Sequence, residues 1–103
     1  MGAPSRPEAA AGVFGPLAGA LETIAETLEA GRGSTDVTAA LHEAAARCQG
    51  RGDLPTDQQR LFQNVHTVVS TWREVWPRMG ARREFRQAVA REARLWARRL
   101  RGG

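Results

Sequence analysis

With 103 residues, of which 42% are hydrophobic and 25% charged, the chain has the size and composition of one globular domain, which excludes wholesale disorder and a collagen-like structure. No apolar run approaches the roughly 18 residues of a membrane-spanning helix, and residues 1–7 lack the features of a secretion signal, so a cytoplasmic protein is expected. The charge is uneven: residues 1–57 hold four Arg and eight acids (net −4), whereas residues 58–103 hold eleven Arg and three acids (net +8).

The N-terminal segment predicts a flexible arm followed by a helix. Residues 1–12 are rich in Ala, Pro and Gly and offer little to bury, so they are predicted to be the arm, with a single helical domain over residues 13–103. The first helix is expected to begin near Phe14, with Pro16 in its first turn and Gly31 at its end. Its apolar residues recur at steps of three and four, which is typical of one face of a helix: Phe14, Leu17, Leu21, Ile24 and Leu28.

A second helix is predicted to follow Ser34, Thr35 and Asp36, residue types that commonly cap helix N-termini, and to stop at Gly50. The single cysteine, Cys48, lies near its end. One cysteine cannot form an internal disulfide and has no partner cysteines for a metal site, so Cys48 is interpreted as a small apolar core residue.

A third helix is predicted from Thr56, which with Gln59 has the form of a capping box, to about Trp76, where Pro77 should break it. Residues 65–72 (VHTVVSTW) are rich in β-branched residues and could suggest a strand. Apolar residues keep the helical period over a much longer window, however, and this favours a helix.

The fourth helix is predicted from about Ala81 to Leu100, and the whole chain is predicted to be an all-α, small four-helix bundle with short loops and a flexible N-terminal arm. Trp72, Trp76 and Trp96 lie on the apolar faces of the last two helices. We therefore expect them in the core, although tryptophans can also stack on nucleic-acid bases.

No motif in the sequence indicates catalysis. His42 and His66 lie off the apolar faces of their helices, without a neighbouring carboxylate, Ser or Cys, and are interpreted as solvated surface residues. Two histidines and one distant cysteine do not supply the three or four ligands of a zinc site, and no phosphate-binding glycine loop is present. We therefore expect a protein that is not an enzyme, with no catalytic residues, no metal and no cofactor.

The last helix carries a row of arginines opposite its apolar face, extending about 27 Å at 1.5 Å per residue. Its acids, Glu84 and Glu92, do not lie three or four residues from any arginine of the helix, so intrahelical ion pairs are not expected. Concentrated guanidinium groups bind phosphate well, which favours a nucleic-acid backbone as the partner. The row, called the arginine stripe below, consists of Arg83, Arg91, Arg94, Arg98 and Arg101, with Gln87 among them, and Arg86 and Arg99 flank the core.

The arginine stripe also has an alternative interpretation. Glu22, Glu26 and Glu29 form an acidic edge on the first helix, and they could neutralise the arginines within the fold or across an oligomer interface. A basic helix can also lie on an anionic membrane surface, but a membrane partner is not expected here.

Residues 54–60 (LPTDQQR) contain a Leu-x-Thr-x-Gln-x-Arg element, and residues 92–103 begin with Glu-Ala and end in Gly-Gly. These two segments resemble the small helical subunit of type III-A CRISPR interference complexes, in which the first element opens a helix and the second is the closing helix. The chain differs from that family in a shorter intervening segment and in arginines where the last helix of the family is rich in aromatic residues. The resemblance implies a non-catalytic antiviral-defence subunit that stacks along a guide and target duplex, with Arg60 as a phosphate contact.

These patterns together predict a non-catalytic subunit of a larger ribonucleoprotein that binds the backbone of RNA or single-stranded DNA. The alternative is a protein-interaction adaptor or regulator that uses the basic C-terminal helix to bind an acidic protein or to self-associate. The predicted nucleic-acid-binding residues are Arg60, Arg83, Arg86, Arg91, Arg94, Arg98 and Arg101.

Overall fold

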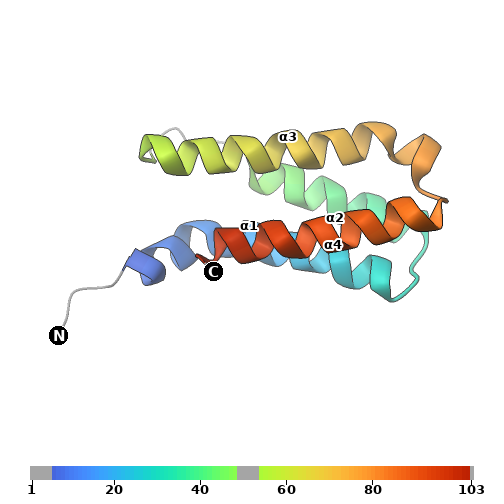
Figure 1. Cartoon of the computed structure of the whole chain (residues 1–103), viewed down its shortest axis with the longest axis horizontal. Coiled ribbons are helices and arrows are strands. Elements are labelled where there is room, and N and C mark those ends of the chain that lie inside the picture. Colours follow the sequence, from blue (N-terminus) through green and yellow to red (C-terminus); the bar gives the residue numbers. More distant parts are fainter. Residues whose placement is uncertain (1–5, 49–53, 103) are drawn as a thin grey trace.

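The computed structural model describes the backbone of residues 6–48 and 54–102, and side chains from Phe14 onward in those ranges. The described residues form four helices and no strand, which confirms the predicted all-α bundle (Figure 1). None of these helices is both long and apolar enough to cross a membrane. The helices are α1 (Arg6–Glu29), α2 (Ser34–Arg47), α3 (Thr56–Met79) and α4 (Arg83–Leu100).

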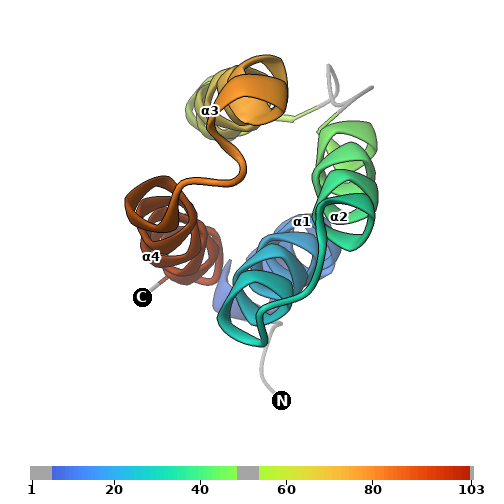
Figure 2. The ribbon, with the colours of Figure 1, turned by 90° about the vertical axis from the view of Figure 1, so that its right-hand side faces the viewer.

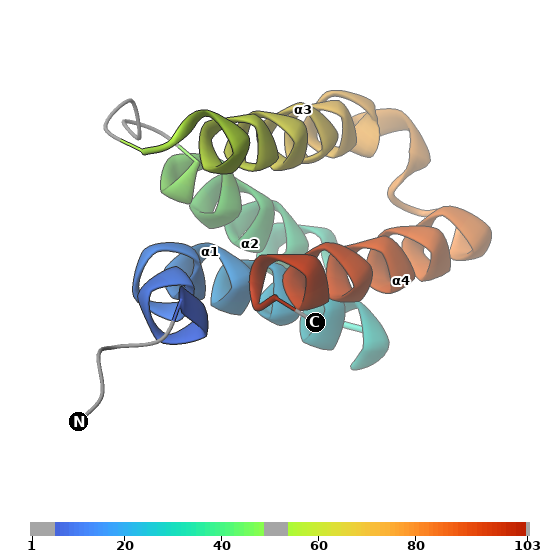
Figure 3. The same cartoon turned by 60° about the vertical axis from the view of Figure 1, so that its left-hand side comes forward.

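The four helices are arranged as a ring in which α1 lies between α2 and α4, with α3 opposite α1 (Figure 2). α1 packs most extensively against α4 and then against α2, while α3 packs on α2 and contacts α4 least. α1 and α4, which are furthest apart in the sequence, therefore lie side by side along most of their length (Figure 3).

The core contains the predicted apolar face of each helix. On α1 the buried residues include Leu17, Leu21 and Ile24, each at most 1% exposed, because their spacing turns them all toward α2 and α4. Trp72 and Trp76 of α3 are buried, as predicted, and Trp76 packs against Phe85 with ring centroids 6.0 Å apart. Trp96 of α4 is only half-buried at the edge of the core.

The end of α1 follows the sequence prediction. Gly31 adopts φ +72°, a left-handed conformation that glycine reaches without a steric penalty. Its N–H donates to the Leu28 carbonyl (3.0 Å), and the N–H of Arg32 donates to the Thr27 carbonyl (3.1 Å). These two bonds satisfy the last carbonyls of the helix in a Schellman motif.

The start of α1 differs from the prediction. The helix begins at Arg6, inside the segment expected to be an arm, rather than near Phe14. Three consecutive alanines at 9–11 are strong helix formers, which explains the extension. Pro16 consequently lies in the helix interior instead of the first turn, and the burial of Phe14 and Leu17 on either side stabilises the helix there. Residues 1–5 of the predicted arm lie outside the described residues.

The N-terminal caps of α2 and α3 are not the residues predicted from the sequence. Gly33 and Pro55 occupy the N-cap positions of α2 and α3, and neither helix has a side-chain cap hydrogen bond. The predicted capping box fails because Thr56 is already helical. The Gln59 amide donates instead to the Leu54 carbonyl (2.6 Å), before the helix starts. The stop predicted at Gly50 lies outside the described residues, and α2 ends at Arg47.

α3 does not end before Pro77. It continues to Met79, and the Gly80 N–H donates to the Trp76 carbonyl (2.8 Å). A proline this close to the end removes one backbone donor while the buried Trp76 keeps the last turn in place. A Cβ atom at Gly80 would lie 2.6 Å from the Trp76 ring, so only glycine fits here. Residues 65–72 are helical, as predicted.

Candidate nucleic-acid interface

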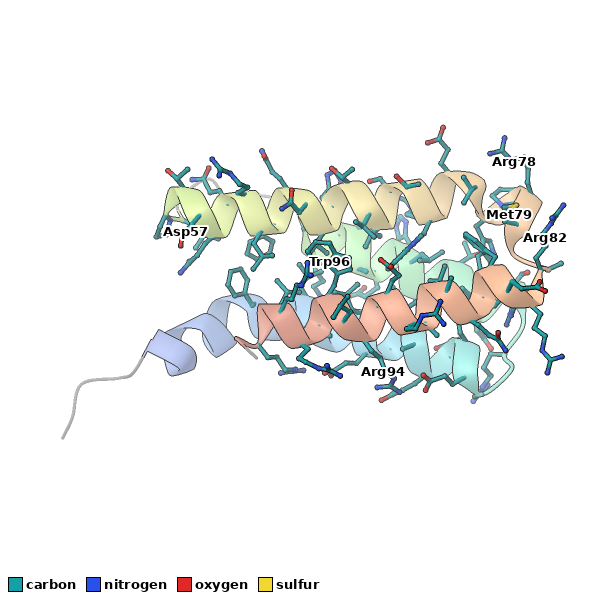
Figure 4. The ribbon with its side chains drawn as sticks, viewed as in Figure 1. Asp57, Arg78, Met79, Arg82, Arg94 and Trp96 are labelled. Carbon is teal, nitrogen blue, oxygen red and sulfur yellow. The ribbon has the colours of Figure 1, made fainter. Side chains whose placement is uncertain are left out.

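α4 places its arginine stripe on the outside of the bundle because its core positions face α1 and α3. Ala93, Ala97 and Leu100 are at most 2% exposed, and all five arginines of the stripe are exposed. Figure 4 shows Trp96 pointing from α4 toward α3, whereas Arg94 points to the opposite side. The arginines therefore share one surface, and their partners decide which of them can bind an external anion.

Two arginines of the stripe pair with α1. Arg94 donates through Nε (2.9 Å) and Nη2 (2.6 Å) to the two carboxylate oxygens of Glu29. Arg101 donates through Nε (2.9 Å) and Nη2 (2.8 Å) to Glu22 in the same two-bond geometry. The structure therefore realises, for these two residues, the intramolecular pairing that the sequence left open as an alternative. No ion pair of Glu26 is found among the described residues. Its negative charge, after the hydrogen bonds and charge of Glu29, helps to raise the pKa of Arg94.

The pairs shift the titration of both carboxylates. The hydrogen bonds from Arg101 lower the pKa of Glu22, and those from Arg94 lower the pKa of Glu29, while partial desolvation opposes both shifts. A carboxylate with a lowered folded-state pKa stabilises the fold above its unfolded pKa, and this contribution is lost as the pH falls through the folded pKa. Because all four side chains are about one-third to one-half exposed, the gain in stability is small at neutral pH.

Arg86 makes three contacts within the fold. Its Nη1 donates to the Gly80 carbonyl (3.0 Å), and its Nη2 donates to the Arg32 carbonyl (2.6 Å). Its guanidinium also lies 5.5 Å from the centroid of the Trp76 ring. Arg86 thus connects the α1–α2 loop to the α3–α4 loop, and these contacts disfavour it as a phosphate ligand.

The contacts of Arg86 predict a stability effect. Arg86→Gln should lower the free energy of unfolding by about 1–2 kcal/mol, because hydrogen bonds from a charged donor to two backbone carbonyls are lost. Urea unfolding followed by circular dichroism measures this change. Arg91→Gln is the control, since Arg91 is exposed, and its change should stay within about 0.5 kcal/mol. Equal stability of the two variants would contradict the structural role.

Arg83, Arg91 and Arg98 remain without partners. All three are exposed, and no hydrogen bond, ion pair or ring contact joins them to another residue in the part of the chain that the structure describes. Arg91 and Arg98 are two turns apart on one face of α4, about 10 Å along the axis. These three guanidinium groups keep all their donors for an external anion.

The predicted contact Arg60 is exposed in the second turn of α3 and is not brought onto the arginine stripe. The start of α3 lies toward the end of the bundle where α4 terminates (Figure 1). Arg78 and Arg82, which were not predicted as site residues, lie near the other end of the bundle, where α3 turns into α4 (Figure 4). They extend the basic surface beyond Arg83, and the spacing R-x₃-R-R at 78–83 was the signal that could have identified them.

The stripe also carries the one large hydrophobic side chain that is exposed among the described residues. Leu95 is 41% exposed, and it lines a surface groove together with Arg91 and Arg98. Glu29 of α1 also lines this groove. The arginine surface is thus partly apolar.

His42, His66 and Cys48 are the residues considered for catalysis or metal binding. His42 and His66 are exposed, as predicted, and the nearest polar contact of His42 is Arg73 Nη2, 3.4 Å from its Nδ1. Cys48 is half-buried against the core, and burial raises the pKa of its thiol to about 11, so it is a poor nucleophile near neutral pH. Within residues 6–48 and 54–102, no three His, Cys, Asp or Glu residues come together as a metal site.

Comparisons with known proteins give no relative for this chain: no family model, no curated protein and no solved structure matches it.

Proposed function

We propose that this protein is a non-catalytic subunit that binds the phosphate backbone of a nucleic acid through the exposed face of α4. The contacts are Arg83, Arg91 and Arg98. Such a protein would act as one component of a larger ribonucleoprotein, as the resemblance of residues 54–60 and 92–103 to a small type III-A CRISPR subunit suggests. The unpaired state of these three arginines is the observation that supports the proposal most directly.

The charges of the surface support an anionic ligand. Glu22 and Glu29 already neutralise Arg101 and Arg94 within the fold, yet three cations of the same helix have no counter-ion there. Like charges held on one helix face repel one another, and a polyanion relieves this repulsion while releasing its own bound counter-ions. Binding to any single residue of such a row is weak, so a ligand with repeated charges is favoured.

The geometry favours contacts to the backbone over base recognition. The guanidinium groups lie along the convex outside of a helix that stays packed in the bundle, and the aromatic residues of α3 and α4 face the core. Phosphate contacts of this kind position a nucleic acid without reading its sequence. RNA and single-stranded DNA of different sequences should therefore bind with similar affinity.

The test is fluorescence anisotropy with labelled RNA and single-stranded DNA of two unrelated sequences, measured between 50 and 300 mM salt. Three phosphate contacts predict a slope of log affinity against log salt of about −2, at roughly 0.7 per contact for single strands. The affinity should differ little between sequences at any one salt concentration. A protein with no salt-sensitive binding to either polymer would contradict the proposal.

A second function, binding of an acidic protein, is favoured by Leu95. An exposed leucine between two unpaired arginines suits a partner helix with one apolar residue flanked by carboxylates, because protein interfaces combine a small apolar centre with a polar rim. Leu95→Ser should weaken the binding of such a partner but leave the salt-dependent binding of a polynucleotide unchanged. Co-purification from cells with wild-type and Leu95→Ser protein separates the two functions.

A further inference from the structure

A surface hollow of about 300 Å³ lies between α1 and the last turns of α4, and each of its four lining residues carries a charged group on an apolar stem. Its residues are Arg94, Arg98 and Arg101 of α4 and Glu22 of α1. The lining residues carry a formal charge of +2, and Glu29, which pairs with Arg94 without lining the hollow, reduces the local charge to +1. The C-terminal end of α4 contributes only about half a negative charge, so the hollow stays positive.

Two of the three arginines are held in place. Glu29 fixes Arg94 and Glu22 fixes Arg101, each through two hydrogen bonds of 2.6–2.9 Å. A guanidinium has five N–H donors, and each pair uses two of them, which leaves three on each arginine. Because these side chains are already ordered, a ligand that binds the remaining donors loses less conformational entropy.

Arg98 completes the cluster. It lies four residues after Arg94 and three before Arg101, so all three project from adjacent turns of one face of α4. Arg98 has no partner among the described residues, and all its donors are free. The charge of Arg94 also contributes, after the hydrogen bonds of Arg101, to lowering the pKa of Glu22, which is consistent with one compact group.

We infer that this hollow binds a terminal phosphate monoester of a nucleic acid, with Arg98 as its free ligand and with Arg94 and Arg101 as pre-positioned ligands. A monoester carries a charge of about −1.5 to −2 at neutral pH and three terminal oxygens that accept hydrogen bonds, one for each guanidinium, whereas an internal phosphodiester carries only −1. The inference rests on the proposed function, and it adds that the protein recognises the end of a strand, at the C-terminal end of α4.

The experiment compares one labelled single-stranded RNA in three forms, with a 5′-phosphate, with a 3′-phosphate or with hydroxyls at both ends, at pH 7.5 and fixed salt. One of the phosphorylated forms should bind about 3- to 10-fold more tightly than the hydroxyl form, because a charge-assisted bidentate contact is added. Inorganic phosphate at millimolar concentration should reduce this preference but leave most of the binding to the hydroxyl form.

Arg98→Gln and Arg91→Gln form a matched pair of variants. Both residues are exposed and unpaired on α4, so both variants should fold, but only Arg98 lines the hollow. Arg98→Gln should abolish the preference for the phosphorylated end, whereas Arg91→Gln should weaken all forms alike and keep the preference. Lowering the pH to 5 should also reduce the preference, since the second pKa of the monoester is about 6.

The results also separate this inference from the proposed function. If all three RNAs bind with the same affinity and salt dependence, backbone binding stands and the end-binding hollow is wrong. A preference that survives Arg98→Gln, or that both variants remove equally, overturns the hollow as well. If none of the RNAs binds, both proposals fail.

Discussion

Replacing Arg83, Arg91 and Arg98 together with glutamine is expected to weaken binding to any polynucleotide by about 100-fold at 0.1 M salt. Each lost phosphate contact makes the slope of log affinity against log salt about 0.7 less negative for a single strand, so the slope should rise from about −2 to near zero. The loss should be the same for unrelated sequences, because phosphate contacts do not read bases. Anisotropy titrations at several salt concentrations measure both quantities.

The triple variant should keep its stability, since none of the three side chains has a partner among the described residues. Its control removes the same total charge elsewhere, through Arg32→Gln, Arg47→Gln and Arg73→Gln on the α1–α2 loop, α2 and α3. If the control loses as much affinity as the triple variant, binding depends only on the net charge of the protein, and the α4 face is not a site.

Leu21→Ala is expected to have the largest effect on stability of a single change. Leu21 is fully buried on α1, the helix that packs against both α2 and α4. Truncation of a buried leucine removes apolar contacts and leaves a cavity, so the free energy of unfolding should fall by about 2–5 kcal/mol. For a domain of this size that is a large part of the total stability, and the urea midpoint should decrease in proportion.

Leu95→Ala is the matched control for the core variant. It makes the same chemical change at a leucine that is 41% exposed, so its effect on stability should stay within about 0.5 kcal/mol. Similar losses for both variants would mean that α1 is not the centre of the core.

The fold could be predicted from periodicity because the apolar residues of each helix repeat over several turns. Residues 65–72 illustrate this: their β-branched composition alone suggests a strand, but the longer pattern from Phe62 to Trp76 keeps helical spacing and is buried as such. A signal that extends over 15 residues outweighs the small propensity differences of individual side chains.

The helix ends were predicted less well because they depend on single residues. The helix end predicted at Gly31 was confirmed, because a residue in the left-handed conformation is a strong local requirement. The helix end predicted at Pro77 was wrong, because the burial of Trp76 stabilises the helix through a position where the local rule predicts a break. Thr56 and Gln59 likewise failed as a capping box once the helix began one residue earlier.

The sequence by itself determined the number of helices, their apolar faces and the presence of arginines on the outside of α4, because each follows from spacing within one helix. Only the tertiary structure decided which arginines are free. Arg94 and Arg101 pair with glutamates 65 and 79 residues away, and the packing of α1 beside α4 brings them together. The partners of Arg86 are backbone carbonyls in two loops, which no rule based on side-chain spacing can identify.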